Sequence, residues 1–67
     1  MTFADKVKYV RMKLYLSQSQ LAKEIGVSFA TINRWENKDL EPQLASIGRF
    51  NDFCEKHGII FEEKLFG

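Results

Sequence analysis

The residues best suited to covalent or metal chemistry in this chain are few. Cys54 and His57 are its only cysteine and only histidine, whereas a structural zinc site normally uses four such ligands. Cys54 also lies on the apolar stripe of a predicted helix, where a free cysteine usually acts as a small core side chain. The carboxylates of Glu62 and Glu63 are adjacent in the chain and cannot flank a substrate. We therefore expect no metal site, no cofactor and no enzymatic activity.

A second group of side chains offers hydrogen bonds rather than covalent chemistry. Ile32 and Trp35 lie three residues apart and would occupy the buried face of one helix. Helical geometry then places Arg34 on the flank and turns four side chains outward, those of Phe29, Ala30, Asn33 and Asn37. Amide and guanidinium groups form paired hydrogen bonds with planar polar partners. This segment is therefore the candidate binding surface, and the rest of the chain must position it.

The length and composition are those of one small folded domain, residues 1–67. Of the 67 residues, 45% are hydrophobic and 28% are charged, and no apolar run approaches the roughly 20 residues needed to cross a bilayer. Charged residues among the first ten argue against a signal peptide. The single cysteine excludes an intrachain disulfide and favours a reducing compartment, the cytoplasm. Helix packing, with or without dimerisation, must supply the stability of so short a chain.

The charge is distributed unevenly, although the formal net charge is only +1. Residues 1–38 hold seven Lys or Arg residues against three acidic residues, and residues 39–67 hold three against six. A basic half and an acidic half can orient a protein against a polyanion without a high overall pI. Small domains also show such asymmetry by chance, so the charge alone does not identify a partner.

Capping residues and apolar spacing predict two helices in the first half of the chain. Thr2 with Asp5, and Ser17 with Gln20, have the spacing of capping boxes. Gly26 is placed to close the second helix in a left-handed conformation. The predicted buried positions are Phe3, Val7, Val10 and Leu14 in the first helix, and Leu21, Ala22 and Ile25 in the second.

A third helix follows after a short turn, with Ser28 as its cap. Only Gly26 and Val27 separate it from the second helix, which predicts a helix-turn-helix over residues 17–37. A fourth helix ends at His57–Gly58, and its predicted apolar stripe contains Leu44, Ile47, Phe50, Phe53 and Cys54. Residues 59–67 form a tail that the sequence specifies less clearly, and the pattern neither predicts nor excludes a fifth helix there. Its apolar residues would cover the core or form a homodimer surface, and covering the core is favoured.

Residues 16–37 read LSQSQLAKEIGVSFATINRWEN. Several of their elements agree in register: L-S-Q, L-A, I-G-V-S and T-I-x-R-W-E-N, with a proline shortly after. This segment resembles the core of the phage-repressor and Cro-like, or XRE-type, helix-turn-helix family, and the resemblance extends over about residues 5–55. It implies an all-α, compact, lambda-repressor-like domain that binds double-stranded DNA and inserts the helix at about 28–37 into the major groove.

Carried over by position, the resemblance implies which residues contact DNA. The base-reading set would be Ser28, Phe29, Ala30, Asn33 and Arg34. Asn33 suits adenine N6 and N7, Arg34 suits guanine O6 and N7, and Phe29 suits a thymine methyl group. The phosphate set would be Ser17, Gln18, Asn37 and Lys38. Other roles stay open, because Arg34 could contact phosphate or solvent, Phe29 could pack at the helix end, and Ser17 is a cap before it is a phosphate contact.

Two further positions are informative when set against the family pattern. The resemblance implies a buried structural ion pair between Arg11 and Glu36. Tyr15 stands where relatives often have glycine or asparagine, so the turn after the first helix should be strained or built differently.

The sequence thus predicts a small sequence-specific transcriptional regulator, a repressor, on a near-palindromic operator as a possible homodimer. The alternative is a protein-interaction module, antitoxin-like or an adaptor, on the same fold. Salt-dependent affinity for duplex DNA separates the two hypotheses. No small-molecule ligand site is visible in the sequence.

Overall fold

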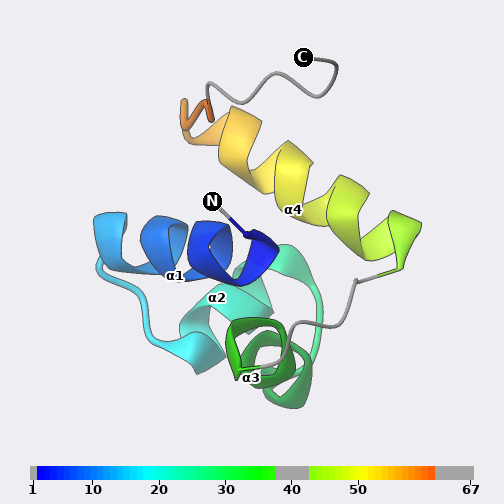
Figure 1. Ribbon diagram of the computed structural model, residues 1–67. Coiled ribbons are helices and arrows are strands. Elements are labelled where there is room, and N and C mark those ends of the chain that lie inside the picture. The colour runs from blue at the N-terminus through cyan, green and yellow to red at the C-terminus, as the bar shows by residue number, and fades with distance from the viewer. Residues whose placement is uncertain (1, 38–42, 62–67) are drawn as a thin grey trace.

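A computed structural model describes residues 2–37 and 43–61 and contains four α-helices in them (Figure 1). They are α1 (Phe3–Lys13), α2 (Gln18–Ile25), α3 (Phe29–Asn37) and α4 (Leu44–Lys56). The predicted all-helical fold is confirmed, with α2 and α3 as the helix-turn-helix. The described residues contain no fifth helix and no strand. Lys38, Pro42 and the tail residues 62–67 lie outside the described ranges.

The first two helices begin at the predicted capping boxes. In α1 the hydroxyl of Thr2 accepts a hydrogen bond from the backbone N–H of Asp5, and the Asp5 carboxylate accepts one from the N–H of Thr2. In α2 the same reciprocal pair joins Ser17 and Gln20, with N···O distances of 3.0 and 2.8 Å. These bonds satisfy backbone donors that a helix start otherwise leaves without partners.

The turn between α2 and α3 is short because of one left-handed glycine. Gly26 caps α2 with φ +89°, a conformation that costs glycine little because it has no Cβ. The hydroxyl of Ser28 then accepts from the backbone N–H of Thr31 at 3.1 Å and caps α3. The predicted end of α2 and start of α3 are therefore confirmed.

The helices α1 and α4 end in the same hydrogen-bond pattern, but with different residues at its left-handed position. In both, two successive backbone N–H groups turn back to carbonyls of the last helical turn, as in a Schellman motif. In α4 the left-handed residue is Gly58, with φ +68°. In α1 it is Tyr15, with φ +57° and a side chain that is 93% exposed. The turn after α1 thus has the geometry of a common helix ending, but a tyrosine occupies the left-handed position that favours glycine.

The core lies where α1, α2, α3 and α4 meet. Its buried members are Val7, Val10, Leu21, Ala22, Ile25, Ile32, Trp35, Phe50, Phe53, Cys54 and Ile59. The ring of Phe3 packs edge-on against Trp35 and against Phe50, each at 5.2 Å between centroids. These contacts join α1 to α3 and to α4. The buried face of α3, the helix that carries the candidate binding surface, therefore packs against the apolar core.

The start of α4 differs from the predicted apolar stripe. Leu44 is 84% exposed and Ile47 is only partly buried, whereas Phe50, Phe53 and Cys54 are buried. Leu44 has the spacing of the stripe, but the prediction that it belongs to the buried face is wrong, because the first turn of α4 extends beyond α1, α2 and α3 (Figure 1). Burial raises the pKa of the Cys54 thiol to about 11, so the thiol stays protonated at neutral pH and is a poor nucleophile.

After α4 the chain covers part of the core. Ile59 is buried, and the ring of Phe61 packs against Tyr9 at 5.8 Å. Ile60, between them, is 82% exposed. Among the described residues, no helix has the length and apolar character required to span a membrane.

Candidate nucleic-acid interface

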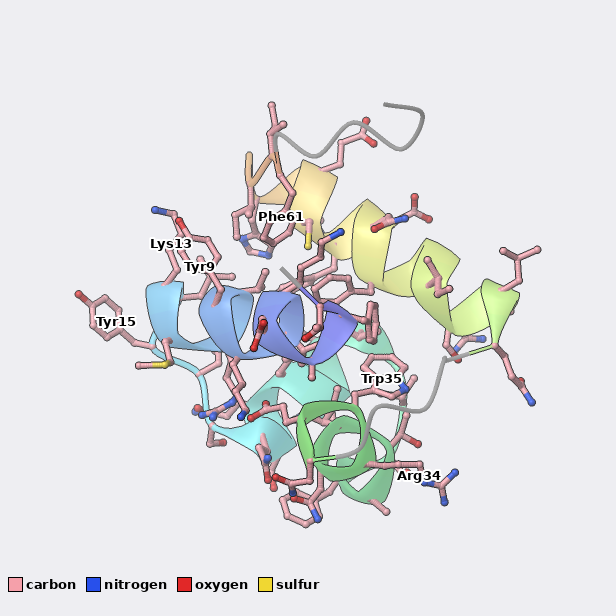
Figure 2. The ribbon with its side chains drawn as sticks, viewed as in Figure 1. Tyr9, Lys13, Tyr15, Arg34, Trp35 and Phe61 are labelled. Carbon is pink, nitrogen blue, oxygen red and sulfur yellow. The ribbon has the colours of Figure 1, made fainter. Side chains whose placement is uncertain are left out.

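The outer face of α3 presents the side chains that the sequence places there. Ile32, Trp35 and Glu36 are buried, and Trp35 points into the core while Arg34 points away from it (Figure 2). Phe29, Ala30, Asn33, Arg34 and Asn37 are all exposed. Phe29 is 51% exposed, which makes it available for contact with a partner. One helix therefore positions four of the five predicted base-reading residues together.

The fifth of these residues, Ser28, has its hydroxyl engaged within the protein. Its Oγ accepts from the Thr31 backbone N–H and lies 2.9 Å from the Thr31 hydroxyl. The Ser28 side chain therefore caps α3 and is less available for base contact than its neighbours. Ser17 is in the same situation at the start of α2, where its hydroxyl serves the capping box with Gln20.

The predicted phosphate-contacting residues are divided among different parts of the structure. Gln18 is the first residue of α2 and is partly buried. Backbone N–H groups at a helix start carry partial positive charge, which suits an anion. Asn37 ends α3 instead, and its amide Nδ2 donates to Oδ1 of Asn33 at 2.6 Å. Lys38 lies outside the described residues.

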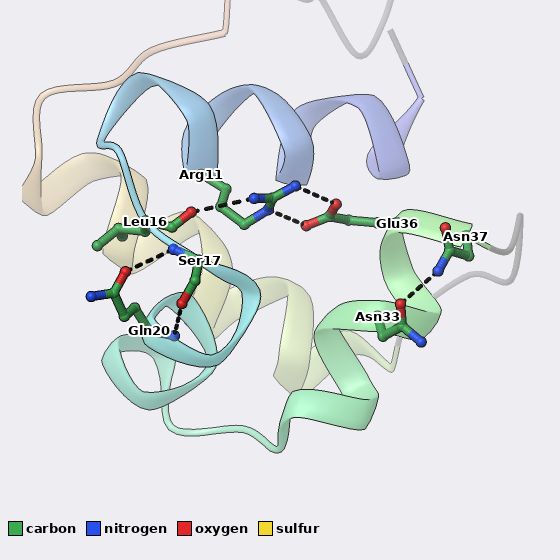
Figure 3. Close-up of polar contacts among 7 residues, drawn as sticks. All are labelled: Arg11, Leu16, Ser17, Gln20, Asn33, Glu36 and Asn37. Carbon is green, nitrogen blue, oxygen red and sulfur yellow. Dashed lines mark hydrogen bonds and ion pairs between the residues drawn. The ribbon is translucent and has the colours of Figure 1, made fainter.

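An ion pair between the partly buried Arg11 and the buried Glu36 holds α3 against α1. The guanidinium of Arg11 donates to both carboxylate oxygens of Glu36, at 2.7 Å from Nε and 3.0 Å from Nη2 (Figure 3). Its Nη1 also donates to the backbone oxygen of Leu16 at 3.3 Å. The hydrogen bonds to Glu36 raise the pKa of Arg11. The structure thus brings together the two residues that the resemblance pairs, and links them to the turn before α2.

Sequence reasoning missed two polar contacts around the helix-turn-helix. Nη1 of Arg49, in α4, donates to the backbone oxygen of Gly26 at 2.8 Å and so ties α4 to the turn. No sequence signal indicates that contact, because it joins residues far apart in the chain. The bond between Asn37 and Asn33 was also missed, although two amides four residues apart on a helix face are neighbours.

Within the described ranges no group of three or more His, Cys, Asp or Glu side chains is placed to hold a metal ion. Arg34 has no hydrogen-bond or ion-pair partner in that part of the chain. The exposed polar chemistry of α3 is therefore hydrogen bonding by an amide pair and a guanidinium, flanked by an exposed aromatic ring. These groups are exposed on one face of α3.

The helix-turn-helix family model of the XRE type matches residues 7–57. No curated protein and no solved structure matches the chain in the corresponding comparisons. The matched residues include all of α2, α3 and α4 and most of α1, so the chain belongs to the helix-turn-helix family. This is a family of DNA-binding regulatory domains rather than of enzymes.

Proposed function

We propose that this protein is a sequence-specific transcriptional repressor that reads the major groove of duplex DNA with α3. The observation that carries the proposal is the division of α3 into a buried face, which contains Ile32, Trp35 and Glu36, and an exposed face with Phe29, Asn33 and Arg34. A helix fits the major groove, where each base pair presents its own pattern of donors and acceptors. The single cysteine suits action in the reducing cytoplasm.

Arg34 and Phe29 supply different parts of the readout. The exposed Arg34 guanidinium matches guanine O6 and N7, a pairing worth about 1–3 kcal/mol of discrimination. The exposed ring of Phe29, with Ala30 beside it, suits a thymine methyl group. Gln18 and the backbone at the start of α2 supply contacts to phosphate, which fix the orientation on the duplex.

Selection of bound sequences from random duplex DNA is the first experiment. The enriched duplex is then titrated by fluorescence anisotropy against the wild type, Arg34→Ala and Lys8→Ala over a salt series. Lys8→Ala removes an equal charge from the exposed surface of α1 and serves as the matched control. We expect Arg34→Ala to lose about 1–3 kcal/mol of preference at one base pair, with Lys8→Ala keeping the preference. Affinity should fall steeply with salt.

Two outcomes would contradict the proposal. The first is that no sequence is enriched, and the second is that binding is weak and unaffected by Arg34→Ala. Either result would favour the protein-interaction module, antitoxin-like or an adaptor, for which the exposed apolar side chains of Met12, Tyr15, Leu44 and Ile60 offer contact surface.

The proposal includes a homodimer on a near-palindromic operator. A single small domain buries only about 600–1,000 Å² against DNA, which limits the affinity of a monomer. Two copies related by a two-fold axis would contact half-sites about 34–36 Å apart.

A further inference from the structure

The two exposed asparagines of α3 form a pair with one defined arrangement. Nδ2 of Asn37 donates to Oδ1 of Asn33 at 2.6 Å, along the surface of the helix (Figure 3). Both residues are exposed, so the bond contributes little to the core. Its main consequence is geometric, because in this arrangement Oδ1 of Asn33 faces Asn37.

That orientation determines which part of Asn33 is available to a partner. A primary amide has an acceptor oxygen and a donor nitrogen that point in different directions from the same carbon. With Oδ1 held against Asn37, Nδ2 of Asn33 is directed away from it. Within residues 2–37 and 43–61, this nitrogen has no hydrogen-bond partner. Asn33 therefore presents two N–H donors on the face that the proposed function assigns to the major groove.

A donor group distinguishes the bases by their acceptors. In the major groove guanine presents two adjacent acceptors, N7 and O6, whereas adenine presents one acceptor and the N6 donor. A free asparagine suits adenine, because it offers its oxygen to N6 and its nitrogen to N7. An asparagine with its oxygen already engaged suits guanine instead.

We propose that Asn37 is a positioning residue that sets the base preference of Asn33, so that Asn33 reads guanine rather than adenine. This inference rests on the proposed function, since it assumes that α3 enters the major groove. It also gives Asn37 a different role from a phosphate contact, because one of its two N–H bonds is committed to Asn33.

The test uses the full chain and the duplex recovered by selection, with all four base pairs introduced in turn at each position. Asn33→Ala first locates the position that Asn33 reads, as the place where base preference is lost. At that position we expect the wild type to prefer guanine over adenine by about three- to tenfold, the value of one neutral hydrogen bond.

Two substitutions at position 37 then separate positioning from other roles. Asn37→Ala frees the Asn33 amide to rotate, so the ratio of guanine to adenine affinity should fall towards one. In Asn37→Asp the carboxylate accepts from Nδ2 of Asn33 and turns Oδ1 outward, so the preference should reverse in favour of adenine. Asn51→Asp adds the same charge to the exposed surface of α4 and controls for general repulsion from DNA. A merely structural role for Asn37 would change affinity or melting temperature without changing this ratio.

Several results would overturn the inference. One is a wild-type preference for adenine at the position read by Asn33, and another is a ratio that neither Asn37 variant changes. A third is an Asn33→Ala variant that keeps the wild-type base preference at every position of the duplex. In all three cases sequence-specific binding remains, so the proposed function survives. Absence of any enriched sequence would instead remove the proposed function and this inference together.

Discussion

At the scale of single residues, Tyr15 has the least expected backbone conformation. It is the one non-glycine residue with positive φ within residues 2–37 and 43–61. Its side chain is 93% exposed, so burial does not compensate for the left-handed conformation. The same position after α4 is occupied by Gly58, which adopts that conformation without a clash of Cβ.

Replacing Tyr15 by glycine should therefore stabilise the protein. The left-handed conformation costs a residue with a Cβ about 1–2 kcal/mol. Glycine avoids that cost, but its extra freedom in the unfolded chain offsets about 0.5–1 kcal/mol of the resulting stabilisation. We expect Tyr15→Gly to raise the free energy of unfolding by about 0.5–1 kcal/mol, measured by urea denaturation. Tyr15→Ala keeps the strain and should give no such increase. Equal effects of the two substitutions would show that the backbone at this turn is not strained.

At the scale of helices, the decisive contact is the ion pair between α1 and α3. Glu36 is buried on the inner face of α3, and Arg11 bonds both of its carboxylate oxygens. A paired charge in such a site is tolerated because its partner and its hydrogen bonds offset the cost of leaving water. The pair also reaches the Leu16 carbonyl, so it links α1, α3 and the turn before α2 in a single contact.

Removing either partner should be more damaging than removing both. Arg11→Ala leaves the Glu36 carboxylate buried without its partner, which typically costs about 3–5 kcal/mol. That is a large fraction of the stability available to a domain of this size. The double variant Arg11→Met with Glu36→Leu leaves no unpaired charge and should be more stable than either single variant. Thermal unfolding followed by circular dichroism checks this order, and additive losses in the double variant would contradict it.

At the scale of the whole molecule, residues 2–37 and 43–61 contain one helix-turn-helix, and α3 is its second helix. The core holds all four helices together through contacts such as Phe3 with Trp35 and Phe50. Arg49 in addition joins α4 to the turn of the helix-turn-helix. These contacts hold α3 against the other described helices, and in the proposed function a second copy supplies the extra affinity.

The proposed dimer predicts a dependence on operator geometry. A full near-palindromic operator should bind far more tightly than an isolated half-site. Inserting five base pairs between the half-sites turns them to opposite faces of the duplex and should abolish the advantage. Anisotropy titrations measure the affinity for the full operator, the half-site and the operator with the insertion. Sedimentation of the complexes gives the number of protein copies bound to each duplex. Equal affinity for the half-site and the full operator, with one protein on each, would show that the protein binds as a monomer.

The amino-acid sequence by itself determined the helices and the division of α3 into two faces. Capping by Thr2, Ser17 and Ser28 and closure of α2 by Gly26 depend on residues a few positions apart, so short-range patterns predict them. The exposed set on α3 follows from the inward positions of Ile32 and Trp35, because helical periodicity is also local.

Only the tertiary structure decided which apolar residues are buried and which polar residues form hydrogen bonds between distant parts of the chain. Leu44 and Ile60 match buried neighbours in type and yet are exposed, because burial depends on where other helices pack rather than on spacing along one helix. Arg49 reaches Gly26 across 23 positions of the chain, and no local pattern indicates that contact. Such contacts depend on the three-dimensional positions of side chains, which periodicity leaves open.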